Sequence, residues 1–183
     1  MCYEQTAILL ITNEMKITNS KIKLKDKNGK FRSGRKISVS STFDCPPEIM
    51  WKKLLDFDTL IEICSPKASF KSVSEKPQKW EENIVYKFKL FIYGFIPFGK
   101  HEILLESINE SRKEIQSREH NKIVKIWNHL ISMSKTENGK TSYTDIVELY
   151  SGVFTYFTAL WSISLYKHRQ RKWCKIIEKL NEI

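Results

Sequence analysis

The C-terminal part of the chain carries the longest helical pattern of apolar positions. Its apolar stripe consists of Phe154, Phe157, Trp161 and Leu165. Residues spaced by three or four lie on one face of an α-helix, and the run 153–183 contains no Gly and no Pro. A second stripe, rotated by roughly 100° at the ideal helical period, consists of Trp173, Ile176, Ile177 and Leu180. We therefore predict one long helix. Its first half covers a sheet, and its second half bends or packs elsewhere, for instance against short helices within 45–63.

Before this helix, several segments alternate apolar and polar residues, which is the period of a β-strand. They lie at 21–24, 36–43, 68–74, 83–97, 100–108, 113–119, 122–133 and 141–150. The first two are read as one interrupted strand or as a hairpin. In the long aromatic segment 83–97, Gly94 and Pro97 predict a bend or bulge near the end. No strand–helix–strand rhythm separates the segments, so we predict an antiparallel sheet.

Two short helices are predicted between the second and third of these segments. Pro46 and Pro47 suit a first helical turn, because the missing N–H of proline would be unpaired there anyway. The second helix spans 58–63 and ends at the Ser65–Pro66 step. Antiparallel strands of this length curl, and the final helix fits the open side. The order of elements therefore predicts an α+β grip with an interior lined by aromatic residues.

The length of 183 residues fits one domain. We assign 21–183 to this domain and expect 1–20 to form either an N-terminal extension or an extra edge strand. The apolar stretch 7–11 is too short for a signal sequence or a membrane span, and no Lys or Arg precedes it. We therefore predict a cytoplasmic protein without a transmembrane helix.

Motifs of catalysis and of cofactor binding are missing from the sequence. It contains no GxSxG, no P-loop and no GxGxxG. The cysteines, Cys2, Cys45, Cys64 and Cys174, form no CxxC pair, and no His lies at metal-finger spacing from them. We expect reduced, partly buried thiols, no metal site and no cofactor.

The formal net charge of +10 favours an anionic partner, or it reflects a lysine-rich solvated surface. A basic stretch in the final helix consists of Lys167, Arg169, Arg171 and Lys172. It is expected either to make peripheral contact with an anionic membrane or to form a solvated helix face. No RNP-like or zinc-finger pattern accompanies the charge, so nucleic acid is not an expected partner.

Several stretches resemble the START/Bet v 1-like (SRPBCC) superfamily, in particular its bacterial members that are similar to polyketide cyclases and lipid-transport proteins. The resemblance is carried by residues 37–43 with 45–51, 56–66, 141–148 and 166–173. It implies a helix-grip fold with a deep apolar cavity between a curved antiparallel sheet and the long C-terminal helix. The superfamily includes carriers, receptors and cyclases, so the fold does not choose among these functions.

His101 and Glu119 form the first candidate site. If the turn lies at 109–111, these residues face each other on neighbouring strands, with Ile103 on the same face. A His–carboxylate pair that faces a cavity orients a polar ligand or acts as an acid–base couple. The alternative is a cross-strand ion pair at the end of a sheet.

The second candidate cluster consists of Trp127, His129, Tyr143 and Asp145. With a hairpin loop at 137–139, the odd positions of the two strands share one face. Three polar groups on a mostly apolar face suit a ligand pocket. The alternative is a buried hydrogen-bond network or a shifted register.

The remaining candidate cavity residues lie on one strand and on the final helix. On the strand they are Tyr86, Phe88 and Leu90, and on the helix Phe157, Trp161 and His168. For the strand residues, ordinary core packing is the alternative. His168 projects close to the first apolar stripe, where it either caps the cavity mouth or lies half exposed at the sheet edge.

These features favour a non-catalytic protein that binds or carries a small hydrophobic or amphipathic molecule. Access to the cavity would require movement of the final helix or of the loop 94–99. One alternative is a cyclase- or hydrolase-like enzyme that acts on an aromatic or polyketide-like substrate through His101/Glu119 or His129/Asp145. Another is an interaction module that docks on an anionic membrane or an acidic partner.

Overall fold

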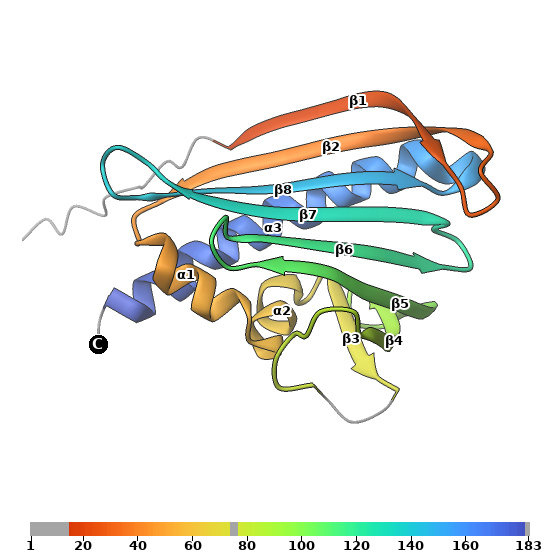
Figure 1. Cartoon of the computed structure of the whole chain (residues 1–183). Coiled ribbons are helices and arrows are strands. Elements are labelled where there is room, and N and C mark those ends of the chain that lie inside the picture. The colour runs from red at the N-terminus through yellow and green to blue at the C-terminus, as the bar shows by residue number, and fades with distance from the viewer. Residues whose placement is uncertain (1–14, 74–76, 182–183) are drawn as a thin grey trace, which may run out of the picture.

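The computed structural model describes residues 15–73 and 77–181 (Figure 1). Its first elements are β1 (Lys16–Lys25), β2 (Phe31–Phe43), α1 (Pro47–Leu54) and α2 (Phe57–Cys64). Six strands follow: β3 (Ala68–Ser72), β4 (Val85–Ile92), β5 (Ile96–Asn109), β6 (Glu114–Asn121), β7 (Ile126–Lys135) and β8 (Thr141–Tyr150). A 3₁₀ turn, η1 (Gly152–Phe154), leads into the long helix α3 (Thr155–Asn181).

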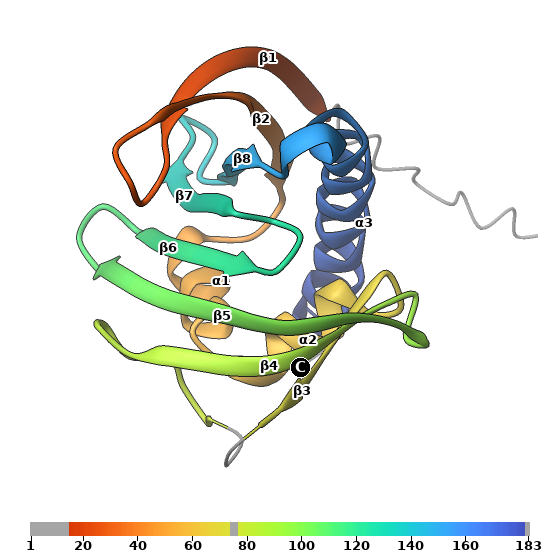
Figure 2. The same cartoon turned by 90° about the vertical axis from the view of Figure 1, so that its right-hand side faces the viewer.

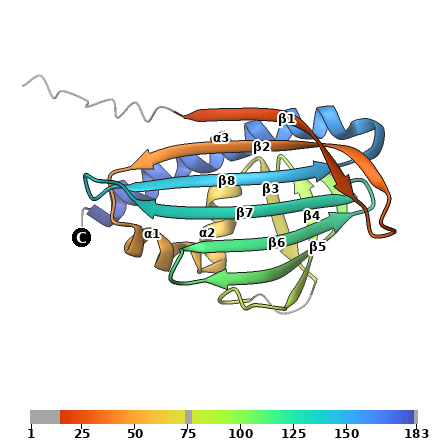
Figure 3. The ribbon, with the colours of Figure 1, turned by 45° about the horizontal axis from the view of Figure 1, so that its top comes forward.

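The strands form one antiparallel sheet in the order β1-β2-β8-β7-β6-β5-β4-β3. Figure 2 shows the sheet curving around α3, and Figure 3 shows α1 and α2 on the same side of the sheet as α3. Each strand except β3 pairs with the strand before it in the chain, and β8 also pairs with β2. The predicted fold class, an α+β helix grip, is confirmed.

The buried face of α3 differs from the predicted stripe. Phe157 is 68% exposed, and Phe154 is exposed as well. The buried face consists instead of Ala159, Ser162, Leu165, Tyr166, Gln170 and Trp173. Small and polar residues make up half of this face. Ala and Ser allow the helix to approach the sheet closely. Gln170 is tolerated there because its side chain is hydrogen-bonded to Ser41 and to the Val39 carbonyl. The pattern of hydrophobic residues therefore predicted a contact face of α3 that is rotated by about one residue position from the face that packs on the sheet.

The second half of α3 packs against the short helices, as predicted. Trp173, Ile176 and Ile177 are buried in the same apolar cluster as Met50 of α1 and Ile63 of α2. His168 adds a polar link, since its Nε2 donates a hydrogen bond to the Ser65 carbonyl at 2.7 Å, directly after α2. The helix is continuous through this point.

The aromatic segment 83–97 is not one bent strand, and this prediction was wrong. The chain reverses between Ile92 and Ile96, so the segment forms β4, a tight turn and the beginning of β5. Tyr93 and Gly94 both have positive φ angles, of 52° and 78°. A tyrosine with a positive φ angle is uncommon. Only Gly94 therefore marks this turn in the sequence, where a typical tight turn would have a glycine or an asparagine at both positions.

At the other edge of the sheet, β1 pairs with β2 along its whole length. It begins at Lys16, so the predicted boundary between residues 20 and 21 falls inside a strand. The part of the predicted extension at 1–14 lies outside the described residues, and the division into domains stays a prediction. The first two predicted strands form a hairpin rather than one interrupted strand.

Candidate functional site

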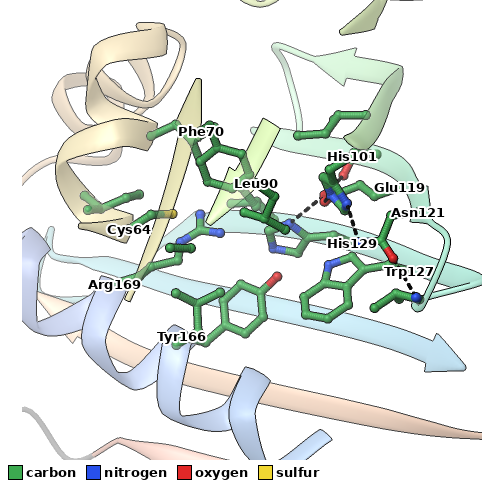
Figure 4. A pocket seen from close by; sticks show the side chains of 18 of the residues that line it. Cys64, Phe70, Leu90, His101, Glu119, Asn121, Trp127, His129, Tyr166 and Arg169 are labelled. Atoms are coloured by element: carbon green, nitrogen blue, oxygen red, sulfur yellow. Dashed lines mark hydrogen bonds and ion pairs between the residues drawn. The ribbon is translucent and has the colours of Figure 1, made fainter. Parts of the chain in front are cut away.

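A cavity of about 100 Å³ lies between the sheet and α3 (Figure 4). Its walls come from the short helices, from β3 to β7 and from the first half of α3. Typical apolar lining residues are Ile63, Phe70, Leu90, Ile103, Trp127 and Leu165. The cavity is partly open. Its partly exposed lining residues include Phe98, Thr158 and Trp161 between β5 and the first turns of α3, and also Leu60, Phe70 and Trp80.

One part of the cavity wall is polar. The polar side chains are His101, Ser117, Glu119, Asn121, His129 and Arg169. Five of them come from alternate positions on the neighbouring strands β5, β6 and β7, and alternate residues of a strand point to the same face. Arg169 reaches the same space from α3, and Figure 4 shows its guanidinium between Cys64 and His129.

His101 and Glu119 form a hydrogen-bonded pair in this wall. His101 Nε2 donates to Glu119 Oε2 at 2.9 Å, and Ser117 Oγ donates to Oε1 at 2.8 Å. On its other side, His101 Nδ1 accepts a long contact of 3.4 Å from Asn121 Nδ2. Asn121 Oδ1 accepts the backbone N–H of Val124 at 2.7 Å, so the amide nitrogen faces the imidazole. These partners place the proton of His101 on Nε2.

The two residues meet although the predicted strand register was wrong. Opposite His101 lies Asn121, and opposite Glu119 lies Ile103. The turn between the strands is longer than predicted, and Glu106 is an extra, bulged residue in β5. The net shift is an even number of positions, so the side chains stay on the same face of the sheet.

His129 lies between two carboxylates. Its Nε2 donates to Asp145 Oδ1 at 3.0 Å, and its Nδ1 lies 3.8 Å from Glu119 Oε1. Burial alone lowers the pKa of His129, but the contacts with Asp145 and Glu119 outweigh burial and raise it above its ordinary value. The two carboxylates therefore favour the imidazolium form more than water does, and in that form His129 bridges the two acids.

Arg169 is a buried cation with loose partners. It is 3% exposed, and its Nη2 lies 3.6 Å from Asp145 Oδ1 and 3.5 Å from the Tyr143 hydroxyl. Its guanidinium also stacks over the Tyr166 ring at 5.0 Å. Arg169 Nε has no hydrogen-bond partner within the described residues. A buried donor without a partner costs free energy unless an acceptor is supplied.

The two carboxylates stay ionised in this environment. Burial alone would raise the pKa of Glu119, but the contacts with His101 and His129 hold it well below its ordinary range. Burial would also raise the pKa of Asp145, and Arg169 together with His129 lowers it. When His129 is protonated, two anions face two cations, and the formal charges of these four groups cancel.

Seven of the predicted site residues line the cavity: Leu90, His101, Ile103, Glu119, Trp127, His129 and Trp161. Tyr143 and Asp145 share the predicted sheet face with His129 but lie on β8, where Gln170 and Trp173 of α3 cover them. They support the cavity wall from behind, with Tyr143 donating to Asp145 at 3.2 Å.

The other predicted site residues lie elsewhere. Phe88 is a core residue stacked on Phe57, and Tyr86 lines a separate surface hollow beside Gln78. Phe157 points away from the cavity because it is on the exposed face of α3. His168 binds the Ser65 carbonyl and is not at the cavity mouth.

The basic stretch of α3 does not form the predicted exposed patch. Arg169 is turned into the protein interior, while Lys167 and Lys172 are only partly exposed and Arg171 is exposed. Successive positions of a helix point in different directions, so four charges within six residues cannot share one face. The inward direction of Arg169 is the main site feature that the sequence interpretation missed.

Other kinds of site find less support. The Cys64 thiol lines the cavity, but burial raises its pKa to about 11, so it is a poor nucleophile at neutral pH. Within residues 15–73 and 77–181, no group of three or more His, Cys, Asp or Glu residues is arranged to hold a metal ion. No helix in the described part of the chain has an apolar stretch long enough to cross a membrane.

No protein-family model matches the sequence, and no curated protein matches it. Solved structures do match the fold. Protein CV1439 from Chromobacterium violaceum aligns with a TM-score of 0.61 at 12% identity, over 78% of this chain and 96% of that one. A START superfamily protein from Mycobacterium smegmatis aligns with a TM-score of 0.59 at 9% identity, over 79% and 98% of the two chains.

Ara h 8.0201 aligns with a TM-score of 0.52 at 14% identity, over 73% of this chain and 93% of that one. The structural alignments show a shared fold, but sequence identities this low leave the activity open. In this chain the fold consists of the curved antiparallel sheet, the two short helices and the long terminal helix around which the sheet curves. The chain therefore has the START/Bet v 1-like helix-grip fold.

Proposed function

We propose that the protein binds a small, mostly apolar molecule that carries a hydrogen-bond acceptor, and holds it in the cavity between the sheet and α3. The observation that carries the proposal is the combination of apolar walls with two buried donors, Arg169 Nε and Trp161 Nε1, that have no hydrogen-bond partner among residues 15–73 and 77–181. Apolar ligand surface contributes about 25 cal/mol for each Å² removed from water. The donors would fix the orientation of the ligand.

The charge balance of the polar wall favours a neutral acceptor, such as a carbonyl oxygen, over a carboxylate. With His129 protonated, the formal charges of Glu119, Asp145, His129 and Arg169 already cancel. A ligand carboxylate would add an uncompensated negative charge beside two buried acids, which is unfavourable at low dielectric. A carbonyl oxygen would accept from Arg169 or Trp161 without that penalty.

The cavity volume limits the ligand. About 100 Å³ is somewhat less than the ~150 Å³ of an apolar cavity that holds benzene, and below the ~300 Å³ at which ordinary ligand pockets begin. We infer that the cavity accepts a short chain in the present conformation, and that a probe with one substituted ring enters as the surrounding side chains relax. A larger ligand requires α3 or the β4–β5 turn to move outward.

The test uses acetophenone and ethylbenzene as probes, because they differ in one carbonyl oxygen. The Trp161 indole N–H gives one of five Trp side-chain signals in a ¹⁵N NMR spectrum, and Trp161→Phe identifies it. We expect acetophenone to shift this signal and to bind about tenfold more tightly than ethylbenzene, because a hydrogen bond to a charged group contributes ~1.5–3 kcal/mol.

Arg169→Met should remove the difference between the two probes, while the exposed control Arg171→Met should keep it. Benzoate should bind more weakly than acetophenone, because of its charge. If neither neutral probe shifts the Trp161 signal, or if benzylamine binds more tightly than acetophenone, the proposal is wrong.

A cyclase- or hydrolase-like activity is the second candidate, and the specific observation in its favour is that both predicted acid–base pairs form. The distances are 2.9 Å for His101–Glu119 and 3.0 Å for His129–Asp145. The raised pKa of His129 favours its protonated form, which cannot accept a proton, and the lowered pKa of Glu119 favours its ionised form, which cannot donate one. The test is hydrolysis of an ester probe. Hydrolysis that is lost in the His101→Gln variant but kept in the His120→Gln variant would favour an enzymatic function over ligand binding alone.

A further inference from the structure

Apolar side chains are exposed together at the end of the molecule where α3 begins. The most exposed are Phe95 at 75%, Val153 at 89% and Phe157 at 68%. Their exposed neighbours in the same segments are Tyr93, Ile96, Phe154 and Leu160, and the β6–β7 loop adds Ile123. Figure 2 looks onto this end and shows the β4–β5 turn, the β6–β7 loop and the start of α3 around it.

Lysines flank these apolar residues. The β1–β2 hairpin contributes the exposed residues Lys25, Lys27 and Lys30, and the β6–β7 loop contributes Lys122 and Lys125. Figure 1 and Figure 3 place both turns at the same end as the start of α3. The acidic residue of the hairpin, Asp26, is bound by Arg32 at 2.7 Å and so offers little free negative charge.

The arrangement is directly linked to the cavity. Phe98 follows the β4–β5 turn, Val124 lies in the β6–β7 loop, and Trp161 lies one turn after Phe157; all three line the cavity. Two of these lining residues, Phe98 and Trp161, are partly exposed and lie close in sequence to the exposed Phe95 and Phe157. A molecule that entered at this end would pass from one apolar surface to another.

We propose that this end, comprising the β4–β5 turn, the β6–β7 loop, the β1–β2 hairpin and the first turns of α3, docks on an anionic lipid bilayer. Aromatic side chains favour the interface between lipid headgroups and acyl chains, and lysines beside them are attracted to anionic headgroups. A second copy of the chain is a poor occupant, because its equally basic end would repel this one.

Docking would bring the opening of the cavity against the lipid. The apolar ligand of the proposed function would then move between bilayer and cavity without crossing water. The docking surface itself stands apart from the ligand proposal, since none of its exposed apolar residues lines the cavity. The two proposals can therefore fail separately.

Vesicle flotation with the full chain tests the docking surface. The probes are vesicles of phosphatidylcholine alone and of phosphatidylcholine mixed with phosphatidylserine. We expect binding to the mixed vesicles, weaker binding to phosphatidylcholine alone, and loss of binding as salt rises, because a screened charge attracts less. The double variant Phe154→Ser/Phe157→Ser should lose at least about tenfold in vesicle affinity.

A charge variant has a matched control at the opposite end of the molecule. Lys122→Glu/Lys125→Glu should abolish the preference for phosphatidylserine, whereas Lys52→Glu/Lys175→Glu, with the same change in net charge on exposed residues, should keep it. Circular dichroism establishes that each variant is folded. Equal binding to both kinds of vesicle, no binding to either, or equal losses in the two charge variants would overturn the proposal. Probe binding at Trp161 without vesicles should be unchanged in all of these variants.

Discussion

His129 Nε2 donates a 3.0 Å hydrogen bond to Asp145 Oδ1, and both side chains are buried where the sheet meets α3. The imidazole lines the cavity, while the carboxylate lies behind it and also accepts from Gln170 Nε2 at 3.2 Å. Asp145 thus links the cavity to the packing of α3 on β2, since Gln170 Nε2 also donates to the Val39 carbonyl at 2.7 Å. Changes in the charge of this pair should affect stability and binding together.

We expect the free energy of unfolding to fall on both sides of a plateau in pH. The folded pKa of His129 is raised, so its stabilising contribution is complete below the unfolded value near 6.5 and is lost as pH rises through the folded pKa. The folded pKa values of Glu119 and Asp145 are lowered. Their contributions are present above the unfolded values near 4.5 and 3.8 and are lost as pH falls through the folded pKa values.

Urea unfolding across this pH range measures the effect. His129→Gln should remove the decrease on the alkaline side, whereas the exposed control His120→Gln should keep it. An alkaline decrease of the same size in both variants would show that another group is responsible.

Arg169→Met should destabilise the protein by about 3 kcal/mol, because it leaves Asp145 with one less buried counter-charge. Arg171→Met, two residues away and exposed, should change stability by less than ~0.5 kcal/mol. Chemical denaturation gives both values. The double variant Arg169→Met/Asp145→Asn should recover part of the loss, and a purely additive result would indicate that the two residues do not interact.

A larger side chain that points into the cavity should cost less stability than a larger side chain at a packed core position. Leu90→Phe places extra volume in the cavity, so we expect a change in stability within ~1 kcal/mol together with loss of acetophenone binding. Leu149→Phe adds the same volume at a fully buried position outside the cavity and should cost ~1–3 kcal/mol. Thermal unfolding with and without the probe separates the two outcomes. Equal costs would mean that the cavity is not a void in solution.

His168→Ala removes the hydrogen bond from α3 to the Ser65 carbonyl and should destabilise the protein by about 1 kcal/mol. Lys172→Ala, one turn further along α3, is the control and should have little effect. Denaturant midpoints compare the two. A neutral His168→Ala would show that water replaces the imidazole at this position without cost.

The periodicity of the sequence predicted the fold because strands and helices have different spacings of buried residues. The same alternation placed His101, Glu119 and His129 on one face, and this placement tolerated an error in register because the shift was even. Periodicity could not show which part of that face α3 covers. Asp145 therefore lies behind the wall rather than in the cavity, although its position along the strand was correctly interpreted.

Polar residues on a buried helix face were the harder case. Arg169 and Gln170 look like solvated positions in the sequence, and their burial depends on partners that are distant along the chain. Gln170 is satisfied by Ser41, Val39 and Asp145. A single sequence does not reveal such long-range partners, so the cation in the cavity wall emerged only from the folded structure.

The anchoring of α3 at one end has a mechanical consequence. His168 and the residues after it are held by α1 and α2, whereas the stretch before it has exposed residues on its outer face. From His168 back to Thr155 the helix extends about 20 Å at 1.5 Å per residue. A pivot of roughly 8° about the anchor would then move its first turn by about 3 Å, while the contacts at the anchor itself shift by much less. At Thr158 and Trp161, which line the cavity nearer to the anchor, the same pivot would give displacements of about 2 Å and about 1.5 Å. A small rotation near His168 would thus widen the cavity beside Phe98 by roughly the length of one carbon–carbon bond.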